Sequence, residues 1–147
     1  HRKARGMDND TYEKKYSVTR NRDKETGKLV SEFWKSAETG MLENPDGAAR
    51  VFYDPKTGNK LEEFHDILDM IHRDENEGSA HRKYHPETGN LIYEAYMQYG
   101  KKNRSDHKPA VIEYDPYTGE ATKWGFFKRG RRYKPPEEDN VPPPPSL

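Results

Sequence analysis

Residues 110–119 read Ala-Val-Ile-Glu-Tyr-Asp-Pro-Tyr-Thr-Gly, and this stretch indicates how the chain folds. A short run of strand-forming residues ends at a tyrosine, and a turn follows at once. In the turn, Pro116 presets the first backbone corner, the Asp115 carboxylate can accept backbone N–H groups, and Gly119 supplies a left-handed residue. A strand that leads into such a turn and is followed by another strand-like run predicts a β-hairpin.

The same pattern occurs four times, and its turn glycines are 31, 31 and 30 residues apart. A fixed period of this length is typical of a repeat protein. We expect the first hairpin to be looser because Lys24 replaces the proline, and the third to be capped more weakly because His85 replaces the aspartate. The four turns occupy residues 23–27, 54–58, 85–89 and 115–119.

The repeats predict an all-β fold, an antiparallel meander of about four tandem hairpin repeats of about 30 residues each. We expect a single repeat domain over residues 16–134, an N-terminal extension over 1–15 whose first six residues are vector-derived, and a disordered Pro-rich tail over 135–147. Aromatic residues recur at equivalent positions and are expected to pack along the array: Trp34, Phe52, Phe64, Tyr84, Tyr96, Tyr114 and Trp124.

Two local features qualify this picture. A second turn follows each long strand, at Thr39-Gly40, Tyr99-Gly100 and Arg129-Gly130, with Met70 in the corresponding slot of the second repeat. Residues 61–73 also have apolar side chains at helical spacing, so one short helix competes with a strand there. The strand is favoured because the aligned stretches of the other repeats are rich in strand-forming residues.

Composition limits the size of the core and the kind of chemistry. Only 20 of 147 residues are Leu, Ile, Val or Phe, while ten Tyr supply amphipathic surface, so a thin extended fold is expected. The chain has no cysteine, and its 26 Lys and Arg balance 26 Asp and Glu. No apolar run approaches the length of a transmembrane helix. We therefore expect a cytoplasmic protein of a bacterial cell or a phage-infected host that does not contact membranes.

Motifs of catalysis and cofactor binding do not emerge from the sequence. The six His residues lack the spacing of metal ligands, and no Gly-rich phosphate loop or nucleophile elbow occurs. Adjacent carboxylates such as Glu62 and Glu63 face opposite sides of a strand and cannot share one proton transfer. The sequence predicts a non-enzymatic protein with no catalytic residues, no cofactor and no metal site.

A resemblance to a known family rests on two short segments, His72-Arg73-Asp74 and Lys108-Pro109-Ala110. With the preceding Trp/Tyr strands and the Thr-Gly turns, they resemble the bacterial and phage repeat that reads His-Arg-x-Asp-Gly-Pro-Ala. That repeat is similar to variant MORN repeats of antitoxin-like proteins. The resemblance covers residues 16–134 and implies a β-hairpin array without an activity of its own.

Charge is distributed unevenly along the chain, and its acidic part indicates a first binding hypothesis. Residues 38–77 carry a net charge of −7. We interpret the chain as a protein–protein interaction module, an immunity-like, antitoxin-like or phage-encoded inhibitor, that steers a basic partner protein with these charges and holds it with nearby tyrosines. The candidate contact residues are Glu62, Glu63, Asp66, Asp69, Asp74, Glu75, Glu77, Tyr93 and Tyr96.

The basic end of the chain supports an alternative, a nucleic-acid-associated accessory protein. Residues 101–134 carry a net charge of +6, and their cations alternate with rings that can stack on bases. The aromatic residues of this basic end have a competing structural role, since they can instead close the core of the last repeat. The candidate residues are Lys123, Trp124, Lys128, Arg129, Arg131, Arg132 and Tyr133. A third hypothesis is a structural or assembly component that oligomerises through its edge strands.

Overall fold

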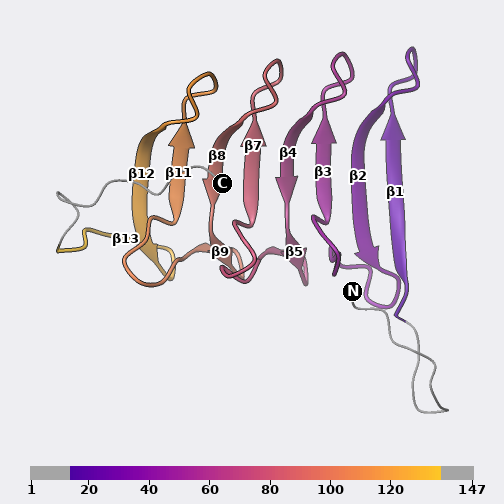
Figure 1. Ribbon diagram of the computed structural model, residues 1–147. Coiled ribbons are helices and arrows are strands. Elements are labelled where there is room, and N and C mark those ends of the chain that lie inside the picture. The colour runs from indigo at the N-terminus through magenta and orange to yellow at the C-terminus, as the bar shows by residue number, and fades with distance from the viewer. Residues whose placement is uncertain (1–13, 137–147) are drawn as a thin grey trace.

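The computed structural model describes residues 14–136. Their strands form a nine-stranded antiparallel sheet in the order β1-β2-β3-β4-β7-β8-β11-β12-β13, accompanied by two short two-stranded ladders (Figure 1). No helix occurs in these described residues. The predicted all-β meander is therefore confirmed.

The main sheet consists of β1 (Tyr16–Arg22), β2 (Leu29–Ser36), β3 (Arg50–Tyr53), β4 (Lys60–Phe64), β7 (His81–Tyr84), β8 (Leu91–Ala95), β11 (Val111–Tyr114), β12 (Ala121–Lys128) and β13 (Arg131–Tyr133). The ladders pair β5 (Asp66–Ile67) with β6 (Met70–Ile71), and β9 (Met97–Gln98) with β10 (Lys101–Lys102). Residues 1–13 of the expected extension and 137–147 of the expected tail lie outside the described residues.

The hairpin tips are closed by the turn chemistry that the sequence predicts. The Gly58 N–H donates to the Asp54 carbonyl at 2.7 Å, and Gly58 has a φ of +81°, which favours glycine. In the third tip, the His85 ring nitrogen accepts from the Thr88 N–H at 3.2 Å, whereas Asp115 accepts the equivalent bond at 2.9 Å. The third cap is longer than its counterpart, as expected from the exchange of aspartate for histidine.

Side chains beside the turn glycines connect one tip to the next. The Asn59 amide donates to the Pro86 carbonyl at 3.1 Å, and the Asn90 amide donates to the Pro116 carbonyl at 2.6 Å. Each asparagine therefore ties its own hairpin to the following one. These contacts, together with the sheet ladder, keep successive repeats in register.

The second turn of each of the last three repeats is a two-residue turn in which both residues have positive φ, as in a type I′ hairpin. Met70, which the repeat comparison predicts for this slot, lies instead at the start of β6, because the turn ends at Asp69. The turn residues and their φ values are Leu68 (51°), Asp69 (62°), Tyr99 (47°), Gly100 (82°), Arg129 (50°) and Gly130 (83°).

The segment 61–73 consists of strands and turns rather than a helix. Phe64 in β4 pairs with Arg50 of β3 on one side and with His81 of β7 on the other. These two ladders require an extended backbone, and they use the N–H and C=O groups that a helix would bond internally. The sheet neighbours therefore decide against the helical spacing of the apolar residues.

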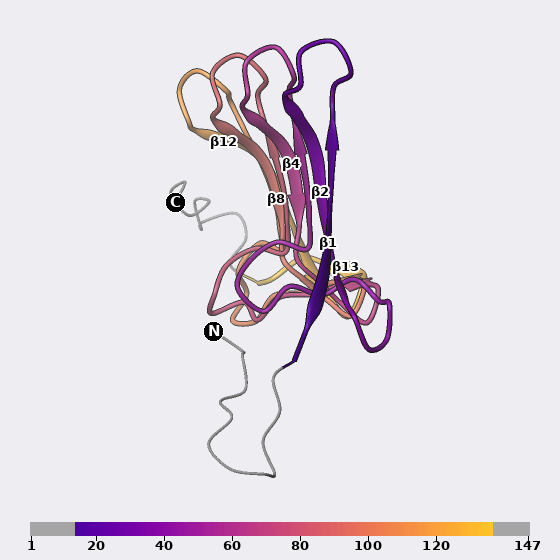
Figure 2. The ribbon, with the colours of Figure 1, turned by 90° about the vertical axis from the view of Figure 1, so that its right-hand side faces the viewer.

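The sheet is a single curved layer, as its edge-on view shows (Figure 2). Because side chains alternate along a strand, the register divides them between two faces. The Tyr–Glu face, as we call it, carries Val51, Glu63, Arg82, Glu94 and Ile112 directly across from one another. All of these side chains except Arg82 are buried, and Ile112 and Glu94 are only 1% and 2% exposed. The core therefore lies on this face.

The opposite surface is the aromatic face, defined by Phe33, Phe52, Phe64, His81 and Tyr93, all of them half-buried. The repeated aromatic positions predicted from the sequence therefore do not form one core. Phe52 and Phe64 lie on the aromatic face, whereas the alternation places the others on the Tyr–Glu face: Trp34, Tyr84, Tyr96, Tyr114 and Trp124.

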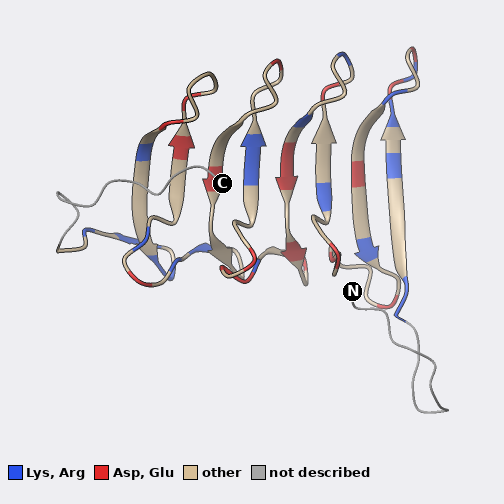
Figure 3. Ribbon diagram, in the orientation of Figure 1, with Lys and Arg blue, Asp and Glu red and all other residues tan. Residues whose placement is uncertain are grey.

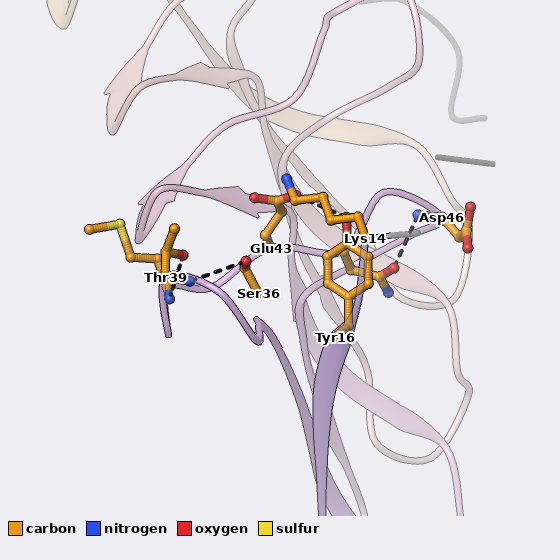
Figure 4. Close-up of polar contacts among 8 residues, drawn as sticks. Lys14, Tyr16, Ser36, Thr39, Glu43 and Asp46 are labelled. Atoms are coloured by element: carbon orange, nitrogen blue, oxygen red, sulfur yellow. Dashed lines mark hydrogen bonds and ion pairs between the residues drawn. The ribbon is translucent and has the colours of Figure 1, made fainter. Parts of the chain in front are cut away.

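The first repeat is fastened by polar contacts near its second turn (Figure 4). The Glu43 carboxylate is buried, and it accepts hydrogen bonds from Lys14 Nζ at 2.9 Å and from the Tyr16 hydroxyl at 3.0 Å. In the same region the Thr39 N–H donates to Ser36 Oγ at 3.4 Å. Strand β1, at one edge of the sheet, is thereby joined to the loop that leads into β3.

Candidate binding surfaces

Tyrosine–carboxylate pairs connect neighbouring hairpins on the Tyr–Glu face. The Tyr84 hydroxyl of β7 donates to Glu63 of β4 at 2.5 Å, and the Tyr114 hydroxyl of β11 donates to Glu94 of β8. Lys60 also bonds Glu63, at 3.1 Å. Each carboxylate is thus buried with a donor from the next repeat, which is the condition for burying charge without a large penalty.

These pairs alter the ionisation of their members. Burial and the hydrogen bond to Glu63 raise the pKa of Tyr84 to about 12. The pKa of Tyr114 is raised further, by burial and by Glu94. Burial alone would raise the pKa of Glu63, but the bonds from Tyr84 and Lys60 outweigh it and the pKa is lowered. The carboxylate of Glu63 is therefore ionised at neutral pH and serves as an acceptor for the tyrosine.

The aromatic face carries a continuous row of rings across β2, β3, β4, β7 and β8. Centroids are 5.6 Å apart for Phe33 and Phe52, 6.3 Å for Phe52 and Phe64, and 4.2 Å for Phe64 and His81, which stack. Tyr93 continues the row 5.2 Å from His81. Each ring touches its neighbour in the next strand, so the row is a rigid apolar strip on a face of the sheet.

Charged groups lie on and beside the strip. The Arg50 guanidinium lies 4.0 Å from the centre of the Phe64 ring and is held by two hydrogen bonds to Asp66, at 3.0 and 2.9 Å. His81 lies 2.6 Å from the Glu62 carboxylate. Burial lowers the pKa of His81 even so, and the imidazole is neutral at neutral pH. The strip thus presents the guanidinium of Arg50, held in place by Asp66, over the ring of Phe64.

The acidic candidates do not form one surface. Glu63 and Asp66 are buried, Glu75 accepts from the Ser105 hydroxyl at 2.7 Å, and Asp69 accepts from the Leu42 N–H at 2.6 Å. Glu62 belongs with His81 on the aromatic face. Most of these carboxylates are therefore acceptors within the protein.

Three acidic candidates do come together. Asp66, Asp74 and Glu77 line a hollow of about 310 Å³, which we call the acidic hollow, and Asp74 and Glu77 are exposed. Because Asp66 also holds Arg50, the acidic hollow adjoins the aromatic face. Of the two candidate tyrosines, Tyr93 lies on the aromatic face, whereas Tyr96 is buried under the Arg104 guanidinium, 3.8 Å from its ring centre.

Two other hollows hold the basic candidates. The basic groove, about 630 Å³, is lined by three of them, Lys123, Trp124 and Arg132, together with Lys102, Val111, Glu113, Thr122, Gly125, Phe127 and Lys134. Lys128 and Arg129 line the turn hollow, about 550 Å³, with Gln98, Tyr99, Lys101 and Asn103. Arg131 and Tyr133 belong to β13 and line neither hollow.

The groove exists because one row of the sheet changes from large to small side chains. On the aromatic face this row carries Phe64 and His81 and then continues with Ala95, Val111 and Gly125. Reasoning from the sequence missed this floor. The signal that would have indicated it is Gly125, a glycine inside an aromatic strand, which often marks a site of close approach.

Comparison with known proteins yields no matching family model, no matching curated protein and no matching solved structure. Within residues 14–136, no helix is long and apolar enough to cross a membrane. The same residues contain no group of three or more His, Asp or Glu side chains arranged to hold a metal ion. The case for a function therefore rests on the surfaces described above.

Proposed function

We propose that the chain is a non-enzymatic protein-binding module and that its contact surface is the aromatic face together with the acidic hollow. One observation carries the proposal: a row of touching, half-buried rings crosses five strands of a single-layer sheet. Aromatic and arginine side chains supply most of the binding energy at protein interfaces. A flat strip of this kind offers contact area to another protein and little enclosure for a small substrate.

Rigidity of the surface supports the same conclusion. Arg50 is held by Asp66 and lies over Phe64, so its side chain is already ordered before a partner binds. Interfaces lose affinity when mobile side chains must be ordered on binding, and this surface avoids part of that cost. The family resemblance suggests one form of such a module, an inhibitor that covers the working surface of another protein.

Charge beside the strip favours a partner with basic side chains next to its apolar contact residues. Asp74 and Glu77 are exposed at the acidic hollow. Exposed charges of one sign accelerate the encounter with a partner of the opposite sign, and salt weakens this effect. We expect the partner's association rate to fall with salt, and to fall in the variant Glu77→Lys, while the melting temperature changes little.

The partner contact is tested by site-specific photocrosslinking in the cells that express the full chain. A photoreactive amino acid replaces Lys83, which is exposed and lies 4.9 Å over the Tyr93 ring. The matched control carries it at Tyr117, which is 72% exposed at a hairpin tip. We expect a discrete adduct from position 83 only, which mass spectrometry then identifies. Equal adducts from both positions, or an adduct from position 117 alone, would exclude the aromatic face as the contact surface.

A further inference from the structure

The C-terminal end of the sheet carries a second surface whose chemistry differs from that of the aromatic strip. Its cations gather around the β12–β13 hairpin (Figure 3). We propose that the basic groove binds single-stranded nucleic acid, with a base against the Phe127 ring and phosphates on the cations of the groove. The groove adjoins the aromatic strip on the same side of the sheet, and the proposal does not depend on the proposed protein contact.

The floor of the groove is shaped to admit a flat group. Val111 and Gly125 pair directly across β11 and β12, so the floor is low and apolar. A Cβ atom at Gly125 would lie 3.0 Å from a ring carbon of Phe127 and 3.5 Å from the guanidinium of Arg132. The glycine therefore lets both side chains close in beside the floor. The volume of about 630 Å³ is within the range of sites that hold ligands of nucleotide size.

One wall of the groove combines a ring with cations. Lys102 Nζ lies 5.2 Å from the centre of the Phe127 ring, and the Arg132 guanidinium lies 5.9 Å from it. Proteins that bind single strands combine aromatic platforms for bases with cations that follow the phosphates, and both components occur here within one groove.

The charge of this surface suits a polyanion. The groove lining contains the cations Lys102, Lys123, Arg132 and Lys134 and a single carboxylate, that of Glu113. The neighbouring turn hollow adds Lys101, Lys128 and Arg129 and contains no carboxylate. Residues of the two hollows come close together near the second turn, since Lys101 and Lys102 are adjacent in the chain and the Gly130 N–H donates to the Lys102 carbonyl at 2.8 Å. A strand of several nucleotides has enough phosphates to engage both.

An acidic protein segment is the competing ligand, and three features favour nucleic acid over it. Both hollows contain an aromatic ring, Phe127 in the groove and Tyr99, which is 56% exposed, in the turn hollow. Successive bases supply stacking rings at regular spacing. Each nucleotide also carries one negatively charged phosphate, which matches the series of cations along the two hollows. The groove carboxylate of Glu113 can accept from the amino group of a base, whereas it would repel an acidic peptide.

Fluorescence anisotropy with labelled dT12 and the full-length chain tests the proposal. We expect saturable binding at 50 mM salt, with log K falling by roughly 0.7 per engaged phosphate, or about 3 for four contacts, as log salt rises. The single variants Lys123→Gln and Arg132→Gln should each weaken binding about threefold or more, and Gly125→Ala, which narrows the groove, should weaken it further. The matched control, Lys56→Gln, removes an exposed cation at a hairpin tip and should leave binding unchanged.

Comparing two ligands on one variant separates a loss of binding from a loss of protein stability. Phe127→Leu retains an apolar side chain but removes the stacking surface, and it should weaken binding of dT12 more than binding of a duplex of equal length. The proposal is overturned if dT12 does not bind, if Lys56→Gln weakens binding as much as Arg132→Gln, or if a glutamate dodecapeptide binds more tightly than dT12. None of these outcomes affects the crosslink from position 83, so the two proposals fail independently.

Discussion

At the scale of single residues, the Tyr114 hydroxyl is the hydrogen-bond donor to the buried carboxyl group of Glu94. Glu94 is 2% exposed, its second oxygen has no hydrogen-bond partner among the described residues, and Arg82 lies 4.0 Å away. Tyr114→Phe leaves this carboxylate without a donor, and we expect the free energy of unfolding to fall by about 1–3 kcal/mol. Urea unfolding measures the change.

Tyr53 provides the matched control. It occupies the equivalent position of the second repeat, is half-buried, and donates no hydrogen bond from its hydroxyl to another described residue. Tyr53→Phe should change the free energy of unfolding by less than about 0.5 kcal/mol. Equal losses in both variants would show that the hydroxyls act through general packing rather than through the carboxylate.

His65 makes the stability of the fold depend on pH. Burial, followed by the positive charge of Arg73, lowers its pKa from 6.5 to about 4. As pH falls below about 6.5 the unfolded chain binds a proton at this position, and the folded chain does not until about pH 4. The stability that neutral His65 contributes is therefore present above pH 6.5 and is lost as pH falls towards 4, by up to about 3 kcal/mol.

The substitution His65→Gln removes this titration. Between pH 6.5 and 4 the melting temperature of the variant should fall less steeply than that of the wild type. Asn76→Gln, at an exposed position without a titratable group, is the control and should leave the slope of the wild type unchanged. If the slope is the same in all three proteins, the burial of His65 does not contribute to acid unfolding.

At the scale of the element, each hairpin depends on a turn residue that only a few amino acids tolerate. Gly58 and Gly89 have φ values of +81° and +76°. A β-branched residue is strained in this region, so Gly58→Val and Gly89→Val should each lower the free energy of unfolding by about 1–3 kcal/mol. Thermal unfolding of both variants that matched the wild type would contradict the assignment of these glycines to the turns.

The two-residue turns offer the opposite experiment, a gain in stability. Leu68 has a φ of 51° and is 49% exposed, so a bulky apolar residue occupies a position that suits asparagine. Leu68→Asn should raise the free energy of unfolding by about 0.5–1 kcal/mol, since asparagine adopts this conformation at lower cost. A melting temperature at or below that of the wild type would show that the Leu68 side chain makes stabilising contacts of its own.

At the scale of the whole molecule, the two ends of the array lack the residues of the tyrosine–carboxylate pair that joins the last three repeats. At two of the three junctions between hairpins, a glutamate of one hairpin accepts from a tyrosine of the next. By register, Trp124 of β12 stands at the glutamate position and Arg22 of β1 at the tyrosine position. Arg20 lies on the edge strand β1 and Lys123 on the part of β12 that β13 does not pair, and charged edge strands resist pairing between molecules. We expect a monomer in sedimentation experiments.

Restoring the missing pair should convert these ends into an interface. In the double variant Arg22→Tyr, Trp124→Glu, β12 of one copy presents a glutamate to a tyrosine on β1 of the next. We expect head-to-tail association that increases with protein concentration, whereas either single variant should remain monomeric. A wild type that already forms oligomers would instead support the role as an assembly component.

The hairpin array and its period follow from local sequence, because turn chemistry acts over five residues and needs no distant partner. The Asp-x-x-Thr-Gly tips and the strands around them are found where the sequence predicts them. Turn chemistry alone does not decide two local features, the backbone of residues 61–73 and the position of Met70. In residues 61–73 the favoured strand, rather than the competing helix, is confirmed, because the ladders with β3 and β7 require an extended backbone. Met70 lies one residue past its predicted turn.

The sequence by itself determined the repeat, the strand order of a meander and the charge difference between its middle and its end. Only the tertiary structure decided which side chains meet, since neighbours across the sheet are separated in the chain, by 12 residues for Phe52 and Phe64 and by 17 for Phe64 and His81. In the folded sheet Glu63 and Asp66 are buried and bonded to other side chains, and the aromatic residues of the repeats lie on two opposite faces. The tertiary structure also opened the groove above Gly125, because pairing across strands, rather than distance along the chain, determines where large side chains give way to small ones.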